Sequence, residues 1–310
     1  MRRSSLSILL AVVALVAGLL STSASVAAPP DDHLEVYEGE VATGQISEIV
    51  DLGVDRHDLQ LSKVKGEKGE KARVRVEAIL SAAQARRLDG KGIEMSPKKV
   101  DGQTATQRSN QLAADGYEVF KKYSGEGGIK AEYEQTAADH PDLAKVVTIG
   151  KTVNGQDIIA MKVTEGAGES EDGEKPAVLY ASAQHAREWI TPEMNRRLMH
   201  HVIDNQDDPK ISKLLEDTEL WFVPVANPDG YDFTFEPDQR LWRKNLRDNN
   251  GDGTIAPGDG VDLNRNYQTK WGYDNEGSSP NTGSETYRGP SAGSEPETKA
   301  FNALAERVGF

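Results

Sequence analysis

Residues 175–193 read KPAVLYASAQHAREWITPE, and this stretch decides the fold. It opens with an apolar run that predicts a buried β-strand, and it ends with Thr191, a candidate helix N-cap, and Pro192, which suits the first helical position. A helix is therefore predicted from Pro192 to about Asn205. In α/β sheets with this order of strand, turn and helix, ligands bind outside the carboxyl ends of the strands.

The polar turn between strand and helix carries His185 and Glu188, three positions apart. A single turn can direct both side chains to one point, and imidazole nitrogen and carboxylate oxygen are both good zinc ligands. A solvent-exposed His and Glu on a surface turn is the simpler alternative, and this spacing alone favours it. The pair indicates a metal site only if other residues support it.

The chain around this stretch continues to alternate between helices and apolar strands. One helix (133–141) and three strands are predicted there: 145–150, 157–165 and 220–227. Apolar strands separated by helices predict a mixed β-sheet with helices on both faces. A last helix is predicted after Ser294 and Glu297, which have capping-box spacing.

The first 28 residues have the composition of a secretory signal peptide. Arg2 and Arg3 precede the apolar residues 6–20, and small residues suited to cleavage follow up to Ala28. The apolar run is shorter than the roughly 20 residues that a membrane-spanning helix needs. We therefore expect a secreted protein without a membrane segment after cleavage; a membrane anchor and a twin-arginine signal are the alternatives.

The composition argues against several classes of function. The formal net charge of −14 becomes −16 without Arg2 and Arg3, so the protein should repel nucleic acid and anionic lipid. The chain has no cysteine, so an exported protein of this sequence depends on core packing or bound metal instead of disulfides. Its 310 residues leave room for about two domains.

Residues 34–100 predict strand, helix, strand, strand, helix and strand, which is the order of a ferredoxin-like α+β module. The second helix begins with Ser81 and Gln84 in capping-box spacing. Residues 101–116 are polar and lack apolar periodicity, so they predict an exposed linker that is open to proteolysis. We expect the domain boundary in this linker.

Two arginines and an asparagine further along the chain favour a peptide-binding site. Arg243 lies in RLWRKNLR, and Asn264 and Arg265 lie in GVDLNRNY. A guanidinium holds a carboxylate with two parallel hydrogen bonds, so Arg265 with Asn264 is predicted to grip the free C-terminus of a peptide. Arg243 is predicted to face a carbonyl oxygen as it becomes an oxyanion. For Arg240 and Arg247, ordinary surface ion pairs are the expectation.

Five segments together resemble one family, the zinc carboxypeptidases of the digestive carboxypeptidase A type, and especially its secreted bacterial members. They keep the family's order and similar spacing over about residues 117–310: QHAREWITPE, NPDGYDFT, RLWRKN, GVDLNRNY and SETYRGP. The resemblance implies a carboxypeptidase-like α/β domain over residues 116–310. It also implies that residues 29–115 are a ferredoxin-like pro-region with its linker, which caps and inhibits the active site.

The resemblance implies a zinc enzyme that hydrolyses the C-terminal peptide bond of peptides or proteins, and we expect a monomer. His185 and Glu188 would bind zinc, and Arg243 would polarise the scissile carbonyl. Asn264 and Arg265 would bind the terminal carboxylate.

Arg187 looks like the family arginine that contacts the substrate further along the cleft. The family's third zinc ligand is a histidine downstream of SETYRGP, followed by a tyrosine and by the glutamate that acts as general base. This sequence ends at Phe310 and has no histidine after His201, so we interpret it as an incomplete precursor. We expect the polypeptide ending at Phe310 to bind zinc weakly and not to hydrolyse peptides.

A calcium site is the second metal prediction, in DNNGDGTIAPGD (248–259). Asp248, Asn250, Asp252 and Asp259 follow the register of a calcium loop, with Asp in place of the usual final Glu. A polar, glycine-rich turn without metal is an equal alternative, because no EF-hand-like helices obviously flank the segment.

Two other functions remain open. One is a related zinc amidohydrolase that acts on cell-wall peptides, which Asn264 and Arg265 make less favourable. The other is a secreted, non-catalytic, calcium-dependent protein that grips peptide termini without cutting them. A reading frame that continues past Phe310 with a histidine and then a glutamate would favour the peptidase, whereas a genuine stop would favour the binder.

Overall fold

The computed structural model describes residues 34–64, 72–117 and 119–310. The chain divides into two compact units, and the second, Asp31–Phe310, contains all of these residues. The predicted signal peptide lies outside the described residues. Within the described part of the chain, no helix is long and apolar enough to cross a membrane.

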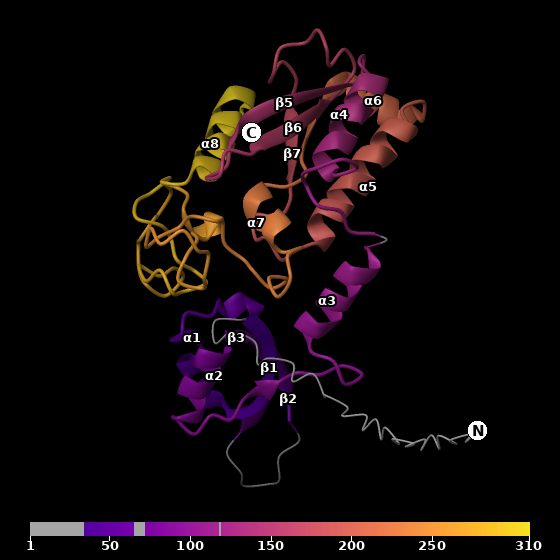
Figure 1. The fold of residues 1–310 in the computed structure, drawn as a ribbon. Helices are drawn as coiled ribbons and strands as arrows, with labels where there is room; N and C mark the ends of the chain where they lie inside the picture. Colours follow the sequence, from indigo (N-terminus) through magenta and orange to yellow (C-terminus); the bar gives the residue numbers. More distant parts are fainter. Residues whose placement is uncertain (1–33, 65–71, 118) are drawn as a thin grey trace, which may run out of the picture. The chain divides into compact units, whose positions relative to one another are not determined.

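An antiparallel sheet of four strands forms the first part of the described chain (Figure 1). The strands lie in the order β2-β3-β1-β4: β1 (Leu34–Ala42), β2 (Gln60–Lys63), β3 (Arg73–Ser81) and β4 (Ser96–Pro97). The helices between them are η1 (Thr43–Gln45), α1 (Ile46–Val50), η2 (Arg56–Asp58) and α2 (Ala82–Asp89). This order confirms the predicted ferredoxin-like module.

The capping box at the start of α2 is confirmed. The hydroxyl of Ser81 accepts a hydrogen bond from the backbone N–H of Gln84 at 3.2 Å, and the Gln84 side chain accepts one from Ser81 N–H at 2.8 Å. Leu88 of the same helix is fully buried and packs with Val76 and Leu80 of β3. The cap and this small apolar core together fix α2 on the sheet.

Most residues of the predicted linker, 101–116, are exposed, but Ala105–Asp115 forms a helix, α3, that the sequence analysis did not predict. Thr104 caps the helix: its hydroxyl accepts from Gln107 N–H at 3.3 Å, and the Gln107 side chain accepts from Thr104 N–H at 3.0 Å. The prediction relied on apolar periodicity, which α3 lacks because most of its residues are exposed. The capping box was the signal that it overlooked.

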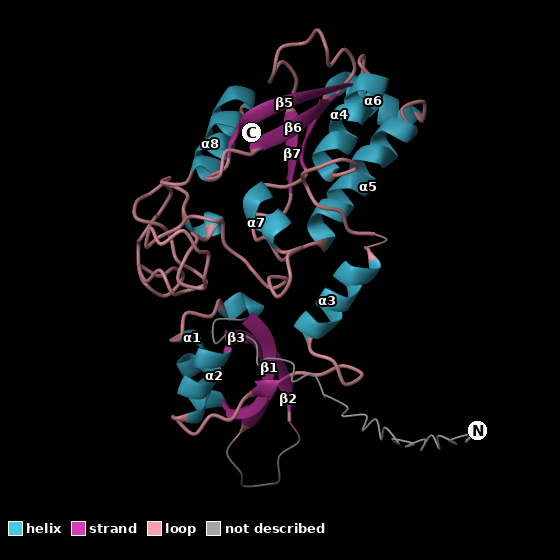
Figure 2. Ribbon diagram, in the orientation of Figure 1, coloured by secondary structure: helices cyan, strands magenta, loops and turns pink. Residues whose placement is uncertain are grey.

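A mixed four-stranded sheet lies at the centre of the following residues (Figure 2). Its strands lie in the order β5-β6-β8-β7: β5 (Ala144–Lys151), β6 (Asp157–Val163), β7 (Ala177–Ala181) and β8 (Glu219–Val223). β7 and β8 are parallel, whereas β6 is antiparallel to both of its neighbours. The predicted mixed sheet is confirmed.

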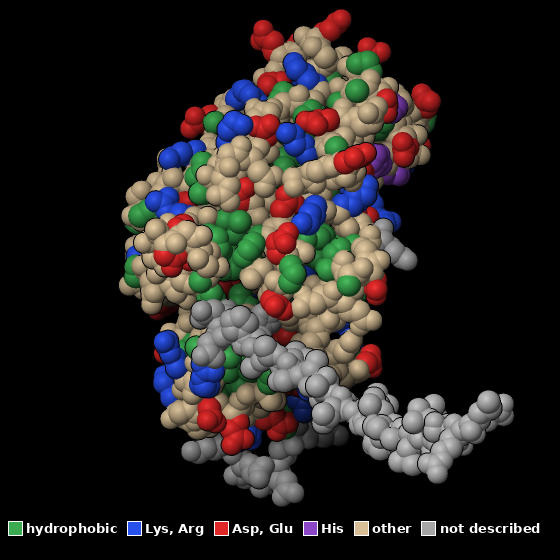
Figure 3. Space-filling view, viewed as in Figure 1, with side chains coloured by type: hydrophobic (Ala, Val, Ile, Leu, Met, Phe, Trp, Pro, Cys, Tyr) green, Lys and Arg blue, Asp and Glu red, His purple; other side chains and the backbone are tan. Residues whose placement is uncertain are grey.

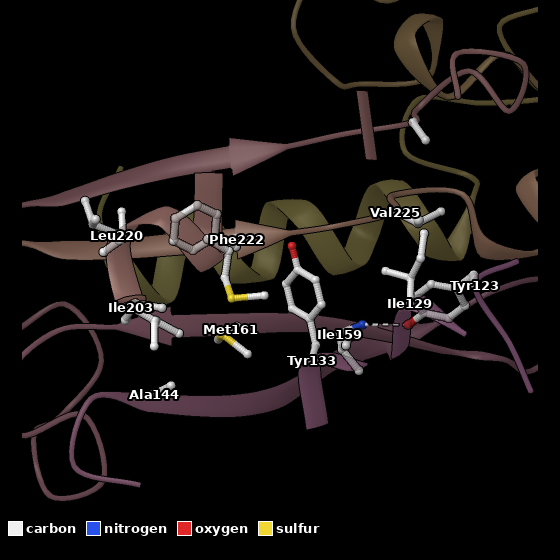
Figure 4. Close-up of a cluster of buried hydrophobic side chains, with 14 of the residues drawn as sticks. Tyr123, Ile129, Tyr133, Ala144, Ile159, Met161, Ile203, Leu220, Phe222 and Val225 are labelled. Carbon is white, nitrogen blue, oxygen red and sulfur yellow. Dashed lines mark hydrogen bonds between the residues drawn. The ribbon is translucent and has the colours of Figure 1, made fainter. Parts of the chain in front are cut away.

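The two faces of this sheet support separate cores, because successive side chains of a strand point to opposite faces. Ile159 and Met161 of β6 pack with Phe222 of β8 in the larger core, shown in part in Figure 4. Helices cover this face: α4 (Ile129–Asp139), α5 (Ile190–Asp204) and α6 (Pro209–Asp217). Ile158 and Trp221 point to the opposite face and pack with α8 (Pro296–Val308).

The predicted start of α5 needs correction. The helix begins at Ile190 with Trp189 in the N-cap position, so Thr191 is not the cap and Pro192 is not the first helical residue. The Thr191 hydroxyl instead donates to the carbonyl of Glu188 at 2.9 Å and accepts from Ala183 N–H at 3.0 Å. These two bonds brace the turn before the helix.

The predicted capping box of α8 is also wrong, because this helix begins at Pro296 with Glu295 as its N-cap residue. The Glu297 side chain accepts from the backbone N–H of Val153 at 3.1 Å, and the Ser294 hydroxyl donates to the Glu295 carboxylate at 2.6 Å. The Ser294 hydroxyl also accepts from the Asn266 amide at 2.9 Å, so contacts outside the helix use both side chains that a capping box would need. The remaining helices are α7 (Pro228–Phe233) and η3 (Leu263–Arg265).

Candidate active site

His185 and Glu188 lie in the turn between β7 and α5, where the sequence places them. The turn closes through a hydrogen bond from Glu188 N–H to the carbonyl of His185 at 3.2 Å. Nδ1 of His185 lies 2.8 Å from Oε1 of Glu188, so the two side chains converge. The His185 side chain is 12% exposed and that of Glu188 is 43% exposed, which leaves the pair open to solvent on one side.

Asp262 is a site residue that the sequence analysis missed. Its Oδ1 lies 3.2 Å from Nε2 of His185, and its Oδ2 accepts from Nη2 and Nε of Arg243 at 2.8 and 3.2 Å. The carboxylate also accepts from the backbone N–H of Asn264 at 2.9 Å. A signal existed, because this acidic residue stands between apolar Val261 and Leu263 in the segment that carries Asn264.

The charges around Asp262 decide the protonation of the site. Burial alone would raise the pKa of Asp262, but Arg243 and the hydrogen bond from His185 outweigh it and hold the pKa far below its usual range. Burial would lower the pKa of His185, but hydrogen bonds to Asp262 and Glu188 outweigh it and raise this pKa. Both shifts favour the charged forms: a protonated His185 and an ionised Asp262.

Arg243 is 1% exposed and carries three ion pairs. Besides Asp262, its guanidinium donates from Nη2 to Oδ2 of Asp55 at 2.7 Å and from Nη1 to Oδ2 of Asp58 at 3.0 Å. Burial alone would lower the pKa of Arg243, but the three carboxylates raise it above its ordinary value. Arg243 is therefore a permanent cation at the centre of the site.

The two carboxylates of the η2 turn, those of Asp55 and Asp58, contact all three arginines that were predicted to contact the substrate. Asp55 Oδ2 also accepts from Arg265 Nη2 at 3.0 Å, and Asp58 Oδ2 also accepts from Arg187 Nη2 at 2.5 Å. A second carboxylate, that of Glu285, binds Arg187 at 2.9 Å. The arrangement brings Arg187, Arg243 and Arg265 together around acceptors from a distant part of the chain.

Gly53 allows this turn to approach so closely. Its carbonyl accepts from Glu285 N–H at 2.8 Å and from the Ser284 hydroxyl at 3.1 Å. A Cβ at this position would lie 2.8 Å from Cα of Ser284, and the φ angle of +92° is strained for other residues. Glycine is therefore required here.

Asn264 and Arg265 line a pocket of about 270 Å³, together with Tyr267, Lys270, Trp271 and Tyr273. Asn264 is exposed. The Arg265 guanidinium also donates from Nε to the carbonyl of Gly277 at 2.7 Å, which orients it without neutralising its charge. A free carboxylate in this pocket would meet an oriented cation.

The visible face of the molecule mixes acidic and basic side chains (Figure 3).

Arg247 forms an ion pair with Glu295 at 3.1 Å, as predicted for this arginine. Arg240 differs from that expectation, because its guanidinium lies 3.9 Å from the centre of the Trp189 ring and donates to the carbonyl of Arg187 at 2.8 Å. Burial lowers the pKa of Arg240 to about 10.

The proposed calcium segment forms a loop that hydrogen bonds close. Asp248 accepts from Gly253 N–H at 2.8 Å, and the Asn250 amide donates to Asp252 at 2.9 Å. Asp259 is 1% exposed and accepts from backbone N–H groups, including that of Asn249 at 2.9 Å. The calcium site stays a prediction.

The fit to zinc is partial. His185 and Glu188 supply the nitrogen and oxygen donors that zinc prefers, and they face one another on the open side of the turn. In the ranges that the structure describes, no group of three or more His, Cys, Asp or Glu side chains could hold a metal ion. The described residues therefore provide two donors and an orienting carboxylate, Asp262.

Comparison with known proteins gives a consistent set of relatives. The family model described as zinc carboxypeptidase matches residues 129–309. A metallocarboxypeptidase A-like protein of Trichophyton verrucosum is 38% identical over 188 residues, which are 61% of this chain and 41% of that protein. Carboxypeptidase A2 of Rattus norvegicus is 30% identical over 266 residues, which are 83% of this chain and 61% of that protein.

The solved structure of carboxypeptidase A from Helicoverpa armigera has a similar fold. It superimposes with a TM-score of 0.63 at 26% sequence identity and covers 89% of this chain and 67% of that one. The chain thus spans 41% to 61% of the length of the two relatives named above.

Proposed function

Because the chain belongs to the zinc carboxypeptidase family and has a carboxypeptidase A-like α/β fold with an N-terminal α+β segment, we propose that it belongs to a carboxypeptidase zymogen. The enzyme would remove C-terminal residues from peptides or proteins outside the cell, after the signal peptide is cleaved. Residues 29–115 would form its pro-region, and residues 116–310 would form the part of the catalytic domain contained in this sequence.

One observation carries this proposal. Three guanidinium groups surround two carboxylate groups of the η2 turn, and one of them, Arg243, shares Asp262 with His185. A substrate peptide also presents a carboxylate, at its C-terminus. We propose that Asp55 and Asp58 occupy the positions of substrate acceptors and so keep the enzyme inactive.

We propose a separate catalytic role for each residue of the site. His185 and Glu188 would hold zinc, which when bound supplies a Lewis acid that polarises the scissile carbonyl and acidifies a water molecule. Asp262 fixes the orientation of the His185 ring through Nε2. Arg243 would donate to the carbonyl oxygen as negative charge develops there.

Asn264 and Arg265 would bind the terminal carboxylate. A guanidinium and an amide recognise a free carboxylate far better than an internal peptide group, and this preference separates an exopeptidase from an endopeptidase. Arg187 would contact the peptide further from its C-terminus, once Asp58 has left it.

Peptide binding tests the role of the arginines. The double variant Asp55→Asn, Asp58→Asn should bind a peptide with a free C-terminus at least about tenfold more tightly than its C-terminal amide, because a charge-assisted hydrogen bond contributes about 1.5–3 kcal/mol. Titration calorimetry measures both affinities. Asp51→Asn, an exposed change near the same turn, is the matched control and should behave like the unchanged chain. Equal affinities for acid and amide would contradict the proposal.

Zinc binding tests the remaining pair. We expect weak zinc binding by the chain, and its loss in His185→Ala and Glu188→Ala. His201→Ala removes an exposed histidine of α5 and should leave zinc binding unchanged. Zinc retention equal in all three variants would exclude the proposed ligands.

A further inference from the structure

Residues 112–116, at the end of α3, are exposed without a break. The helix ends at Asp115, whose negative charge is unfavourable at a helix C-terminus, and Gly116 follows with a φ of +83°. A short helix end of this kind opens easily. Its sequence, LAADG, contains neither lysine nor arginine.

The residues directly after this stretch are anchored in the large core. The Tyr117 ring packs edge-on against Trp189 at 5.0 Å and against Phe235 at 5.3 Å, and Phe120 packs against Trp189 at 5.4 Å. Trp189 itself is stacked between Phe235, at 4.1 Å, and the Arg240 guanidinium, at 3.9 Å. Tyr117 and Phe120 therefore belong to the aromatic core next to the Glu188 turn.

Tyr123 strengthens this anchor and is 1% exposed. Its backbone N–H donates to Asp232 at 2.6 Å, and its hydroxyl donates to the carbonyl of Asp157 at 2.6 Å. The same hydroxyl accepts from Ile159 N–H at 3.3 Å, as the dashed line in Figure 4 shows. A cut C-terminal to Phe120 would remove Tyr117 and Phe120 from this core.

The first half of α3 is held on both sides. The backbone N–H of Thr106 donates to the Glu35 carboxylate of β1 at 3.2 Å. The Asn110 side chain donates to the Asp238 carboxylate at 2.7 Å and accepts from Asp238 N–H at 3.1 Å. These bonds fix residues up to Asn110 and leave the last turn of the helix as the accessible part.

We propose that the processing site of this zymogen lies within Leu112–Gly116, and that its activating protease selects small or aliphatic residues and not lysine or arginine. This inference rests on the proposed function and adds its regulation. Water is added across one peptide bond, whose C–N bond breaks to give a new carboxylate and a new amino terminus. The cut leaves Tyr117 on the catalytic part.

The lysines and arginines near α3 are poorer cleavage sites than Leu112–Gly116. Lys99 is exposed but directly precedes a closed turn, in which Val100 and Gln103 form two backbone hydrogen bonds at 2.9 and 3.2 Å, so the bond after Lys99 is held by its next residue. Arg108 is exposed, but the following Ser109 is buried in the middle of the helix. Lys121 pairs with Glu132 at 2.9 Å, and it lies beyond the aromatic anchor.

Limited proteolysis of the full chain tests the assignment. An elastase-type protease, which cleaves after small aliphatic residues, should produce a fragment that retains Phe310 and begins within positions 113–117, as read by intact mass. A Phe310-containing fragment that begins C-terminal to Phe120 as the earliest elastase product would overturn the proposal. So would faster cleavage by trypsin after Lys99, in a parallel digest of the same chain, than by the elastase-type protease within Leu112–Gly116.

A variant separates backbone access from side-chain preference. Ala114→Arg places a trypsin site in the exposed turn, and trypsin should cleave after position 114 at least about tenfold faster than after Arg108, because cleavage follows the ease of local opening. Arg108 is the matched control within the same helix. Equal rates at the two positions would overturn the proposal.

Both readouts report where an added protease cuts the chain, and they require neither zinc nor any peptidase activity of the chain itself. Failure of the proposed function would show instead as unchanged binding of free-carboxylate peptides. The two failures are therefore distinguishable.

Discussion

Two buried carboxyl groups of this protein have opposite properties. Asp262 lies between His185 and Arg243 in the candidate active site and is fully buried, and Arg243 and His185 hold its pKa far below the usual range. Glu297 lies in the first turn of α8 and is 1% exposed. Burial, helped by the nearby Glu295, raises the pKa of Glu297 to about 7, although hydrogen bonds from Val153 and Asn245 oppose this rise.

The difference shows that burial alone does not decide the charge of a carboxyl group. A guanidinium at 2.8 Å keeps Asp262 ionised, whereas Glu297 has the Asn245 amide at 3.2 Å and a backbone N–H at 3.1 Å. The candidate active site therefore holds a fixed negative charge on Asp262, which orients Arg243 and His185. The helix start holds an acid that binds a proton near neutral pH.

The largest expected effect comes from removing the ion pair that keeps Asp262 charged. Arg243→Ala leaves the buried charge of Asp262 without its main partner, so the free energy of unfolding should fall by about 3–5 kcal/mol. Urea denaturation measures this change. Arg75→Ala removes an exposed ion pair with Glu40 and should cost at most about 1 kcal/mol. Equal losses in the two variants would show that Asp262 does not need Arg243.

The second prediction concerns the pH dependence that Glu297 causes. Its pKa is about 7 in the folded protein and 4.5 in the reference state, so the folded state binds more protons between these values and stability falls as pH rises from about 4.5 to 7. Glu297→Gln should remove this slope, which amounts to at most about 3 kcal/mol at 1.36 kcal/mol per unit.

Denaturation at several pH values measures the slope. Glu306→Gln, at an exposed position of the same helix, should keep it. A slope unchanged in Glu297→Gln would remove Glu297 from the comparison.

The third prediction adds Asp55 of the candidate active site to the comparison between Asp262 and Glu297. Asp55 is a third buried carboxylate, and it accepts from both Arg243 and Arg265. Asp55→Asn should lower the free energy of unfolding by about 1.5–3 kcal/mol, because charged hydrogen bonds are lost while Asp262 and Asp58 still neutralise Arg243. Asp51→Asn should change it little, and an equally small loss for Asp55→Asn would contradict the ionic account of the cleft.

The smallest effect is expected at an exposed carboxylate. Without calcium, Asp252→Ala should change the free energy of unfolding by less than about 0.5 kcal/mol, as for most surface substitutions. If the loop binds calcium, equilibrium dialysis should detect retention by the unchanged chain and less retention by this variant. Equal retention by both chains would exclude the predicted calcium site.

Much of the fold could be predicted from the sequence, because strands and core helices carry their signal in local periodicity. β6 and β8 are apolar on both faces, which predicts a covered sheet, and the Ser81 capping box marks the start of α2. α3 was missed because an exposed helix has no apolar stripe. The starts of α5 and α8 were misplaced because these side chains form other hydrogen bonds in place of a helix cap. Thr191 bonds within the preceding turn, to Glu188 and Ala183, and Glu297 bonds to the distant residues Val153 and Asn245.

The candidate site was predictable in its residue types and not in its contacts. The HxxE spacing placed His185 and Glu188 in one turn, and the structure brings them together. Nothing local in the sequence indicates that Asp55 and Asp58 meet Arg243, since these contacts span more than 180 positions. Asp262 was missed for a related reason, because its role depends on two partners from separate segments.

The alternation of β6 and β8 between two cores has a consequence for how this family's sequences can change. A single-residue insertion within β6 would exchange the side chains that Ile158 and Ile159 present to the two faces, and both cores would fail at once. Insertions or deletions in the central strands should therefore be tolerated only when they involve two residues, and single-residue changes should occur only in the neighbouring loops.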